Sequence, residues 1–216
     1  MNKKRELKTV TLTINLAIII FELFGFINVF RSIGLNAFLY YTENSNLILL
    51  ISSIMLCVYL IGDLKGKKFK VPKWFSAFRL TGVLSVTVTF LVVLFILTPE
   101  FDNGFYGAFI ENSMKYHHLL CPLLGMISFI FYEKYEFKKY DNVKSLIFTI
   151  IYSAILVPLN IFKVVDGPYP FLKVHGANLL KSAITSSLIL IGTIILSYIL
   201  VILNKKFCVK KIETLK

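Results

Sequence analysis

Long uninterrupted apolar runs are the feature that most constrains this chain. Six of them stand out, separated by short connections that hold most of the charged residues. They cover residues 10–30, 38–62, 75–97, 117–132, 146–162 and 182–203. A run of roughly 20 apolar residues spans the ~30 Å hydrocarbon core of a bilayer as a helix, because a helix satisfies its own backbone groups. The sequence therefore predicts an all-α, polytopic membrane protein with six transmembrane helices, forming a single domain over residues 1–216.

The composition supports this class and argues against two others. Of the 216 residues, 56% are hydrophobic and 17% are charged, and the net charge is +12. No aromatic-interleaved basic patch accompanies that charge, so nucleic acid is not an expected partner. The 3 cysteines lie far apart in the chain, which argues against a disulfide framework or a structural zinc site. We expect membrane lipids as partners and no cofactor.

The connections between the runs alternate in basic charge and thereby predict the topology. The N-terminal segment, the second and fourth connections and the tail are rich in basic residues: Lys3, Lys4, Arg5, Lys8, Lys65, Lys67, Lys68, Lys70, Lys73, Lys134, Lys138, Lys139, Lys144, Lys205, Lys206, Lys210, Lys211 and Lys216. The other connections hold only Arg31, Lys115, Lys163, Lys173 and Lys181. By the positive-inside rule, both termini are predicted to be cytoplasmic, in the cell membrane. We interpret the lysines as topology anchors rather than as specific sites for anionic lipid.

A polar stretch, TENSN, opens the second run at its outer edge. Thr42, Ser45 and Asn46 are spaced i, i+3, i+4 and therefore share one helix face. Such side chains commonly bond the carbonyl one turn earlier or hold neighbouring helices together. The alternative is a catalytic role for the Thr42 hydroxyl.

Two adjacent histidines, His117 and His118, open the fourth run, again at the outer surface. An imidazole in this position can act as a base or a ligand near neutral pH, or it can be an interfacial polar group satisfied by water. No second carboxylate or cysteine at ligand spacing lies nearby, so no metal site is predicted. Cys121, one turn after His117, is either a second candidate nucleophile or a small packing residue.

Glu22 lies well inside the first run, where a charge costs ~2.5–3.5 kcal/mol by insertion scales. At ~1.5 Å per residue it lies about 12 Å below the outer surface, and Thr42 and His118 lie about 6 Å below it. The three side chains could therefore converge in the outer third of a helical bundle. The other interpretation is a protonated Glu22 bonded to a backbone carbonyl or to Asn15 on the same face.

Three motifs together resemble a known family. They are TENSN, the His-x-x-x-Pro spacing from His118 to Pro122, and PYPFL at 168–172. In this order they are similar to the signatures of Pr6Pr-type integral membrane proteins, a group related to the androgen-induced-gene hydrolases. That resemblance implies a six-helix architecture over nearly the whole chain. It also implies hydrolysis of fatty acid esters of hydroxy fatty acids.

The resemblance implies a threonine and a histidine as catalytic residues, which fall on Thr42 and His118. His117 is the alternative because the spacing to the proline differs between subfamilies. The animal group's N-H-x-x-H segment is not reproduced before His118. The outer loop residues of the third motif are Pro168, Tyr169, Pro170 and Phe171.

The chemistry implied for this set is acyl transfer. A threonine hydroxyl needs a base to remove its proton, and histidine is the usual one. Ser45 or Asn46 would donate hydrogen bonds to the oxyanion, and Glu22 would orient the imidazole or neutralise it. The residues leave a second class open, a small transporter or membrane sensor with Glu22 and His118 as its proton or ligand site.

Overall fold

The structure, a computed structural model, describes residues 3–67, 71–173, 175 and 179–209. Every regular element among them is helical, which confirms the all-α prediction. The longer helices are α1 (Lys3–Ile33), α2 (Tyr41–Leu64), α3 (Phe75–Val92), α5 (Cys121–Phe131), α7 (Ile147–Ile161) and α8 (Leu179–Asn204). The connections hold the short helices α4 (Gly104–Phe109) and α6 (Asp141–Ser145) and 3-10 turns at Gly34–Leu39, Thr98–Glu100 and Pro170–Leu172. Three π-helical turns are Val93–Leu97, Lys115–Leu120 and Lys205–Val209.

Five helical segments are long and apolar enough to cross a membrane. They are Lys3–Leu39, Tyr41–Leu64, Phe75–Glu100, Asp141–Ile161 and Leu179–Cys208. Large apolar side chains such as Phe24, Ile155 and Ile194 are exposed along these helices, as expected where lipid rather than water covers the surface. These features indicate a multi-pass membrane protein.

The predicted run at 117–132 forms a shorter element than the other five. It consists of the π-helical turn Lys115–Leu120 followed by the 11 residues of α5. Pro122 explains the change of winding, because a proline has no N–H to donate to the carbonyl four residues earlier, which here is that of His118. Widened turns of this kind are frequent at functional sites.

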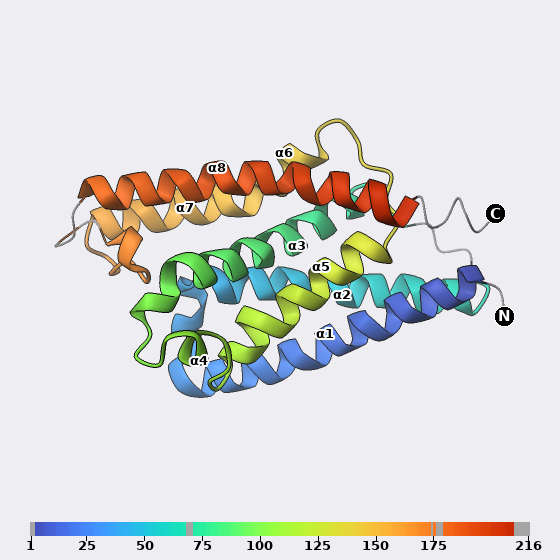
Figure 1. Ribbon diagram of the computed structural model, residues 1–216, viewed down its shortest axis with the longest axis horizontal. Helices are drawn as coiled ribbons and strands as arrows, with labels where there is room; N and C mark the ends of the chain where they lie inside the picture. Colours follow the sequence, from blue (N-terminus) through green and yellow to red (C-terminus); the bar gives the residue numbers. More distant parts are fainter. Residues whose placement is uncertain (1–2, 68–70, 174, 176–178, 210–216) are drawn as a thin grey trace.

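The long helices run along one axis, and α3 lies at the centre of the bundle (Figure 1). It packs against α2 and α5 on one side and against α7 and α8 on the other. The start of α1 and the end of α8 lie at the same end of the molecule in Figure 1. An ion pair between Lys8 and Asp63 joins α1 to the end of α2 there. We call this the lysine-rich end; the lysines at 68, 70, 210, 211 and 216 lie outside the described residues.

The buried residues form a polar layer toward each end of the bundle with an apolar layer between them. On α1 the order is Asn15, Ile18 and Glu22, all fully buried. The other helices repeat this order, with Ser52, Leu49 and Asn46 on α2, Arg79, Val86 and Thr89 on α3, and Ser128, Cys121 and His117 on α5 and the turn before it. Apolar residues therefore make up most of the layer between the two ends, and α3 also buries Thr81, Ser85 and Thr87 there.

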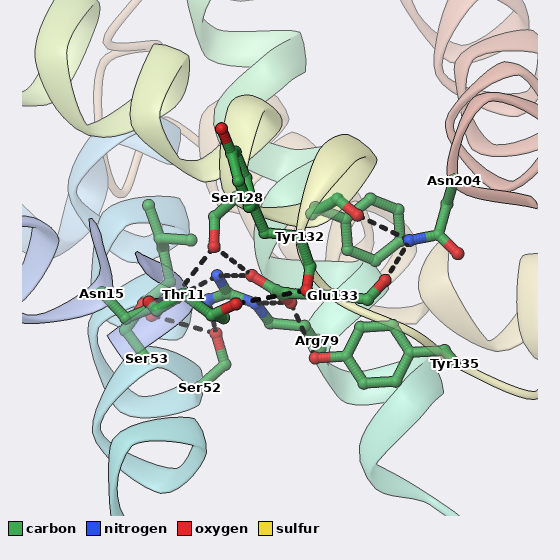
Figure 2. A network of polar contacts seen from close by, with 12 residues as sticks. Thr11, Asn15, Ser52, Ser53, Arg79, Ser128, Tyr132, Glu133, Tyr135 and Asn204 are labelled. Atoms are coloured by element: carbon green, nitrogen blue, oxygen red, sulfur yellow. Dashed lines mark hydrogen bonds and ion pairs between the residues drawn. The ribbon is translucent and has the colours of Figure 1, made fainter. Parts of the chain in front are cut away.

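Arg79 and Glu133 form a buried ion pair in the polar layer of the lysine-rich end (Figure 2). The Arg79 Nε and Nη2 atoms donate to the two Glu133 carboxylate oxygens at 3.0 and 2.8 Å. The remaining guanidinium donors reach Asn15 Oδ1, Ser52 Oγ and Ser53 Oγ. All five guanidinium N–H groups are thus used, which is what a buried arginine requires.

The carboxylate of Glu133 is equally well supplied with donors. Ser128 Oγ donates to it at 2.6 Å and Tyr135 Oη at 2.7 Å, and Figure 2 shows both side chains turned toward it. Burial alone would raise the pKa of Glu133, but the charge of Arg79 and these hydrogen bonds hold the pKa below its usual value. Asn204 on α8 donates to the backbone carbonyl of Glu133 at 2.7 Å. This Arg79 network therefore ties α1, α2, α3, α5 and α8 together at one end.

Candidate functional site

Glu22, His117 and Glu43 form a second buried cluster of charged groups, in the polar layer far from the lysine-rich end. The imidazole of His117 lies between the two carboxylates, with its Nδ1 atom 2.8 Å from Glu43 Oε2 and its Nε2 atom 3.3 Å from Glu22 Oε2. The three side chains come from the middle of α1, the first turn of α2 and the π-helical turn before α5. We call this the His117 cluster.

A glycine on α1 makes room for this imidazole. A Cβ atom on Gly25 would lie 2.1 Å from His117 Nε2, so no other residue fits without moving the ring. The Phe26 ring packs on the other side, with its centroid 4.8 Å from that of His117. The imidazole is therefore fixed in place by its packing as well as by the carboxylates.

This geometry favours His118 over His117 as the candidate base. Both of its ring nitrogens face carboxylate oxygens, which accept protons and do not donate them when ionised. Neither nitrogen is left with a lone pair directed at a substrate. His117 instead bridges two buried acidic side chains, Glu22 and Glu43.

His118, the neighbouring residue, has the opposite arrangement. Its Nδ1 atom is 2.7 Å from the backbone carbonyl of Ala108 in α4. A carbonyl can only accept, so Nδ1 carries the proton and Nε2 keeps its lone pair. Nε2 makes no hydrogen bond to any described residue. This fixed tautomer is the one that a general base requires.

A cavity of about 350 Å³ opens beside His118. Thr42, Glu43 and His118 line it together with Tyr169 from the PYPFL loop. The structure thus places two predicted site residues, Thr42 and His118, on the wall of one cavity that we call the Thr42 cavity. No hydrogen bond joins Thr42 to either imidazole among the described residues.

Tyr169 is the partner of Thr42 instead. Its hydroxyl accepts a hydrogen bond from the Thr42 backbone N–H at 3.2 Å and lies 3.4 Å from the Thr42 hydroxyl. Burial raises the pKa of the Tyr169 phenol to about 12, and the negative charge of Glu43 adds to this shift. Tyr169 therefore keeps its proton at neutral pH and can donate it in a hydrogen bond inside the cavity.

The loop that carries Tyr169 has a defined shape. A Cβ atom on Gly167 would lie 2.6 Å from the Leu172 carbonyl, so the loop can close on itself only at a glycine. The Tyr169 and Phe171 rings stack with centroids 5.3 Å apart. Ser186 of α8 donates to the Phe171 carbonyl at 3.3 Å and anchors the loop to that helix.

Ser45 and Asn46, the oxyanion donors proposed from the sequence, make their hydrogen bonds within the helix bundle. Ser45 Oγ donates to the Thr42 carbonyl at 2.8 Å and pairs with Thr89 Oγ1 at 3.0 Å. Asn46 uses its amide N–H groups on the carbonyls of Thr42 and His117. Both side chains hold helices together, which is the alternative interpretation of their shared face. Tyr169, which the sequence placed in the outer-loop motif without a chemical role, has the hydroxyl that lies beside Thr42.

For Glu22 and Cys121, the contacts in the structure favour one of the alternatives that the sequence left open. Asn15, the proposed partner of Glu22, belongs to the Arg79 network and bonds Ser128 and Arg79. Glu22 contacts His117 rather than His118. Cys121 is fully buried in the apolar layer, with its thiol 4.0 Å from the Ile18 carbonyl, which fits a packing residue and not a nucleophile.

An apolar groove of about 760 Å³ lies next to the Thr42 cavity, between α3 and α8. Phe95, Leu188 and Leu196 are among the side chains that form its walls. Leu97, Glu100 and Pro170 line both the groove and the cavity, so the two spaces meet at these residues. We call this space the α3–α8 groove. It has the size and character to hold a hydrocarbon chain.

No group of three His, Cys, Asp or Glu side chains among the described residues is placed to hold a metal ion. The His117 cluster shows why, since its two carboxylates contact different edges of the imidazole and do not converge on one point. Comparison of the chain with protein-family models, with curated proteins and with solved structures finds no match. The likeness to Pr6Pr-type proteins therefore rests on the three motifs and stays a prediction.

Glu43 and the Arg79–Glu133 pair are the important residues that the sequence did not single out. Glu43 stood in the polar stretch beside Thr42, but nothing in the sequence indicated that it would face His117. An arginine inside an apolar run was visible at position 79, whereas its partner lies 54 positions later in a connection. A single charge in a run signals that a partner exists, but it does not identify that partner.

Proposed function

We propose that this protein is a six-span membrane protein that hydrolyses lipid acyl esters in the Thr42 cavity, near the outer leaflet. Both termini are then cytoplasmic, at the lysine-rich end. The basic residues support this orientation, as does the location of the start of α1 and the end of α8 at one end of the bundle (Figure 1). Thr42 lies in the first turn of α2, and His118 lies in the π-helical turn before α5. Both are at the end of the bundle away from the lysine-rich end, which is the predicted outer side.

The observation that carries the proposal is a threonine and a correctly protonated histidine on one cavity wall. In the reaction, the Thr42 hydroxyl attacks the ester carbonyl carbon while its proton moves to His118 Nε2. The Tyr169 hydroxyl donates to the oxyanion that develops. The alcohol leaves with the proton from His118. Water, activated by the same imidazole, then releases the fatty acid from Thr42.

The α3–α8 groove supports a lipid rather than a water-soluble ester. Its entrance residues Leu97 and Pro170 also line the Thr42 cavity, so a chain in the groove would hold its ester close to the threonine. Positioning a substrate in this way lowers the entropic part of the barrier before any chemistry begins. A substrate that stays in the bilayer would enter between α3 and α8.

The test is hydrolysis of fluorogenic acyl esters by the purified protein in detergent. We expect Thr42→Ala and His118→Ala to abolish turnover. Thr87→Ala is the matched control, because the Thr87 hydroxyl bonds the Val83 carbonyl and lines none of the spaces described above. The proposal fails if the two site variants hydrolyse these esters as fast as the control.

A second candidate function is proton or ligand binding without catalysis, as in a small transporter. The contact of Glu22 with His117 favours it, since buried titratable groups in membrane helices often serve proton relays. Among the described residues, the apolar side chains of Ile18, Leu49 and Val86 leave only hydroxyl groups such as that of Ser85 to carry a proton across the bundle. Proton-coupled uptake that is lost in Glu22→Gln would support this candidate over the hydrolase.

A further inference from the structure

Two tyrosines form a corner in the Thr42 cavity. Tyr40 and Tyr169 both line the cavity, and their ring planes meet at 86° with centroids 6.0 Å apart. Phe101 adds a third aromatic side chain to the same wall. Aromatic rings that stand at right angles around one space are the usual way in which proteins bind quaternary ammonium groups.

The charged groups of this cavity are acidic. Glu43 and Glu100 line it, and no lysine or arginine is among its described lining residues. Glu43 is 8% exposed, and its Oε2 atom faces His117. The Glu43 carboxylate is therefore held in place at the edge of the cavity, where it attracts a cation more strongly than a carboxylate in bulk water does.

The basic side chain nearest this acidic lining is already in use. His117 lies between Glu22 and Glu43, so it is not free to pair with an anion in the cavity. An anionic head group would find no lysine or arginine among the described lining residues, whereas a cation would find Glu43 and Glu100.

We infer that the Thr42 cavity binds the alkylammonium head of an amphiphile whose acyl chain lies in the α3–α8 groove. This deepens the proposed function by naming the head group of its substrate, and in that respect it rests on the proposed function. The ammonium lies against Tyr40, Tyr169 and Glu43. The hydroxyl of Tyr169, bonded to Thr42, then places the ester next to the nucleophile.

The experiment measures binding, so it does not depend on hydrolysis. Choline and its uncharged isostere 3,3-dimethylbutan-1-ol are titrated against the full chain in maltoside micelles by isothermal titration calorimetry. The two molecules have the same shape and differ in charge. We expect the isostere to bind about 30-fold more weakly, or not at all, because a desolvated cation–π contact is worth about 2 kcal/mol.

Matched variants locate the site. Tyr40→Leu and Glu43→Gln should each weaken choline binding at least fivefold, while Tyr40→Phe should retain it because the ring face remains. Tyr106→Leu and Glu111→Gln are the controls, since both residues are exposed and neither lines the cavity. Retained choline binding with lost hydrolysis in Thr42→Ala would separate this inference from the proposed reaction.

Phosphocholine distinguishes two sources of the ammonium. If it binds as well as choline, the head group is that of a phospholipid. If only choline binds, it is that of an ester of an amino alcohol. The inference is overturned if choline does not bind, if the isostere binds equally well, or if the control variants lose as much affinity as the cavity variants.

Discussion

The Arg79 network yields the most quantitative prediction about this fold. In Glu133→Gln, the shape of the side chain is kept, but an amide replaces the carboxylate that Arg79 contacts through two N–H groups. One side-chain oxygen is lost as an acceptor, so a guanidinium N–H or one of the donors Ser128 and Tyr135 faces an amide N–H₂. Breaking a buried pair by removing one partner costs about 3–5 kcal/mol, and we expect that loss here.

A second substitution tests whether the loss comes from the unpaired charge. Arg79→Met combined with Glu133→Gln removes both charges and leaves a neutral polar layer. We expect the double variant to be no less stable than Glu133→Gln alone, whereas independent effects would add to roughly twice the loss. The measurement is the free energy of unfolding from SDS titration of mixed micelles, followed by circular dichroism.

The Lys8–Asp63 pair is the matched control at the same end of the bundle. Its side chains are 31% and 46% exposed, so Asp63→Asn should cost less than about 1 kcal/mol. The reasoning is refuted if Glu133→Gln costs no more than this control, or if the losses of the single variants add in the double variant.

Three other predictions concern the far end of the bundle, acid stability and catalysis. Gly25→Ala should displace His117 and cost about 1–3 kcal/mol, whereas Gly192→Ala, which meets nothing within 4 Å, should cost less. The pKa of Glu133 is lower in the folded protein than its usual 4.5, so its charged form stabilises the fold fully above pH 4.5. This stabilisation is lost as the pH falls through the lower pKa of the folded state. The stabilities of wild type and Glu133→Gln should therefore converge as the pH falls below 4.5. Tyr169→Phe should lower kcat for acyl esters by about 10²-fold or more if its hydroxyl stabilises the oxyanion.

Each of these has a result that would contradict it. Equal stability of the two alanine variants would show that His117 is not held by the glycine contact. A wild-type advantage that persists at the lowest pH would show that Glu133 is not the titrating group. Unchanged kcat in Tyr169→Phe would remove the phenol from the mechanism, although binding of choline should survive this change because the ring remains.

The apolar runs predicted the helices because the bilayer permits little else. A stretch such as residues 182–203 has too few polar side chains to favour any structure other than a membrane helix. The helix α8 includes the whole stretch. The run at 117–132 is the instructive case. Pro122 and the histidines were visible in the sequence. The π-helical turn before α5, however, depends on how the backbone N–H groups near Pro122, which has none of its own, pair with the carbonyls of the preceding turn.

Partners between helices could not be predicted in the same way. Glu22 and Asn15 lie seven residues apart on one face, but at ~1.5 Å per residue they are separated by about 10 Å along α1. Each therefore finds partners at its own level, His117 for one and Arg79 for the other. The position of a polar residue along the helix axis could be predicted by counting residues from the end of the run. Its partner on the neighbouring helix depended on how the helices rotate and pack.

The account depends on Thr42 being the nucleophile and His118 its base, and covalent labelling tests this most directly. The purified protein would be treated with an alkyl phosphonate, which modifies an activated hydroxyl, and the modified residue would be located by mass spectrometry of its peptides. We predict a single adduct on Thr42 that is absent in His118→Ala and retained in Ser45→Ala. An adduct on another residue, or labelling of Thr42 that does not change in His118→Ala, would contradict the account.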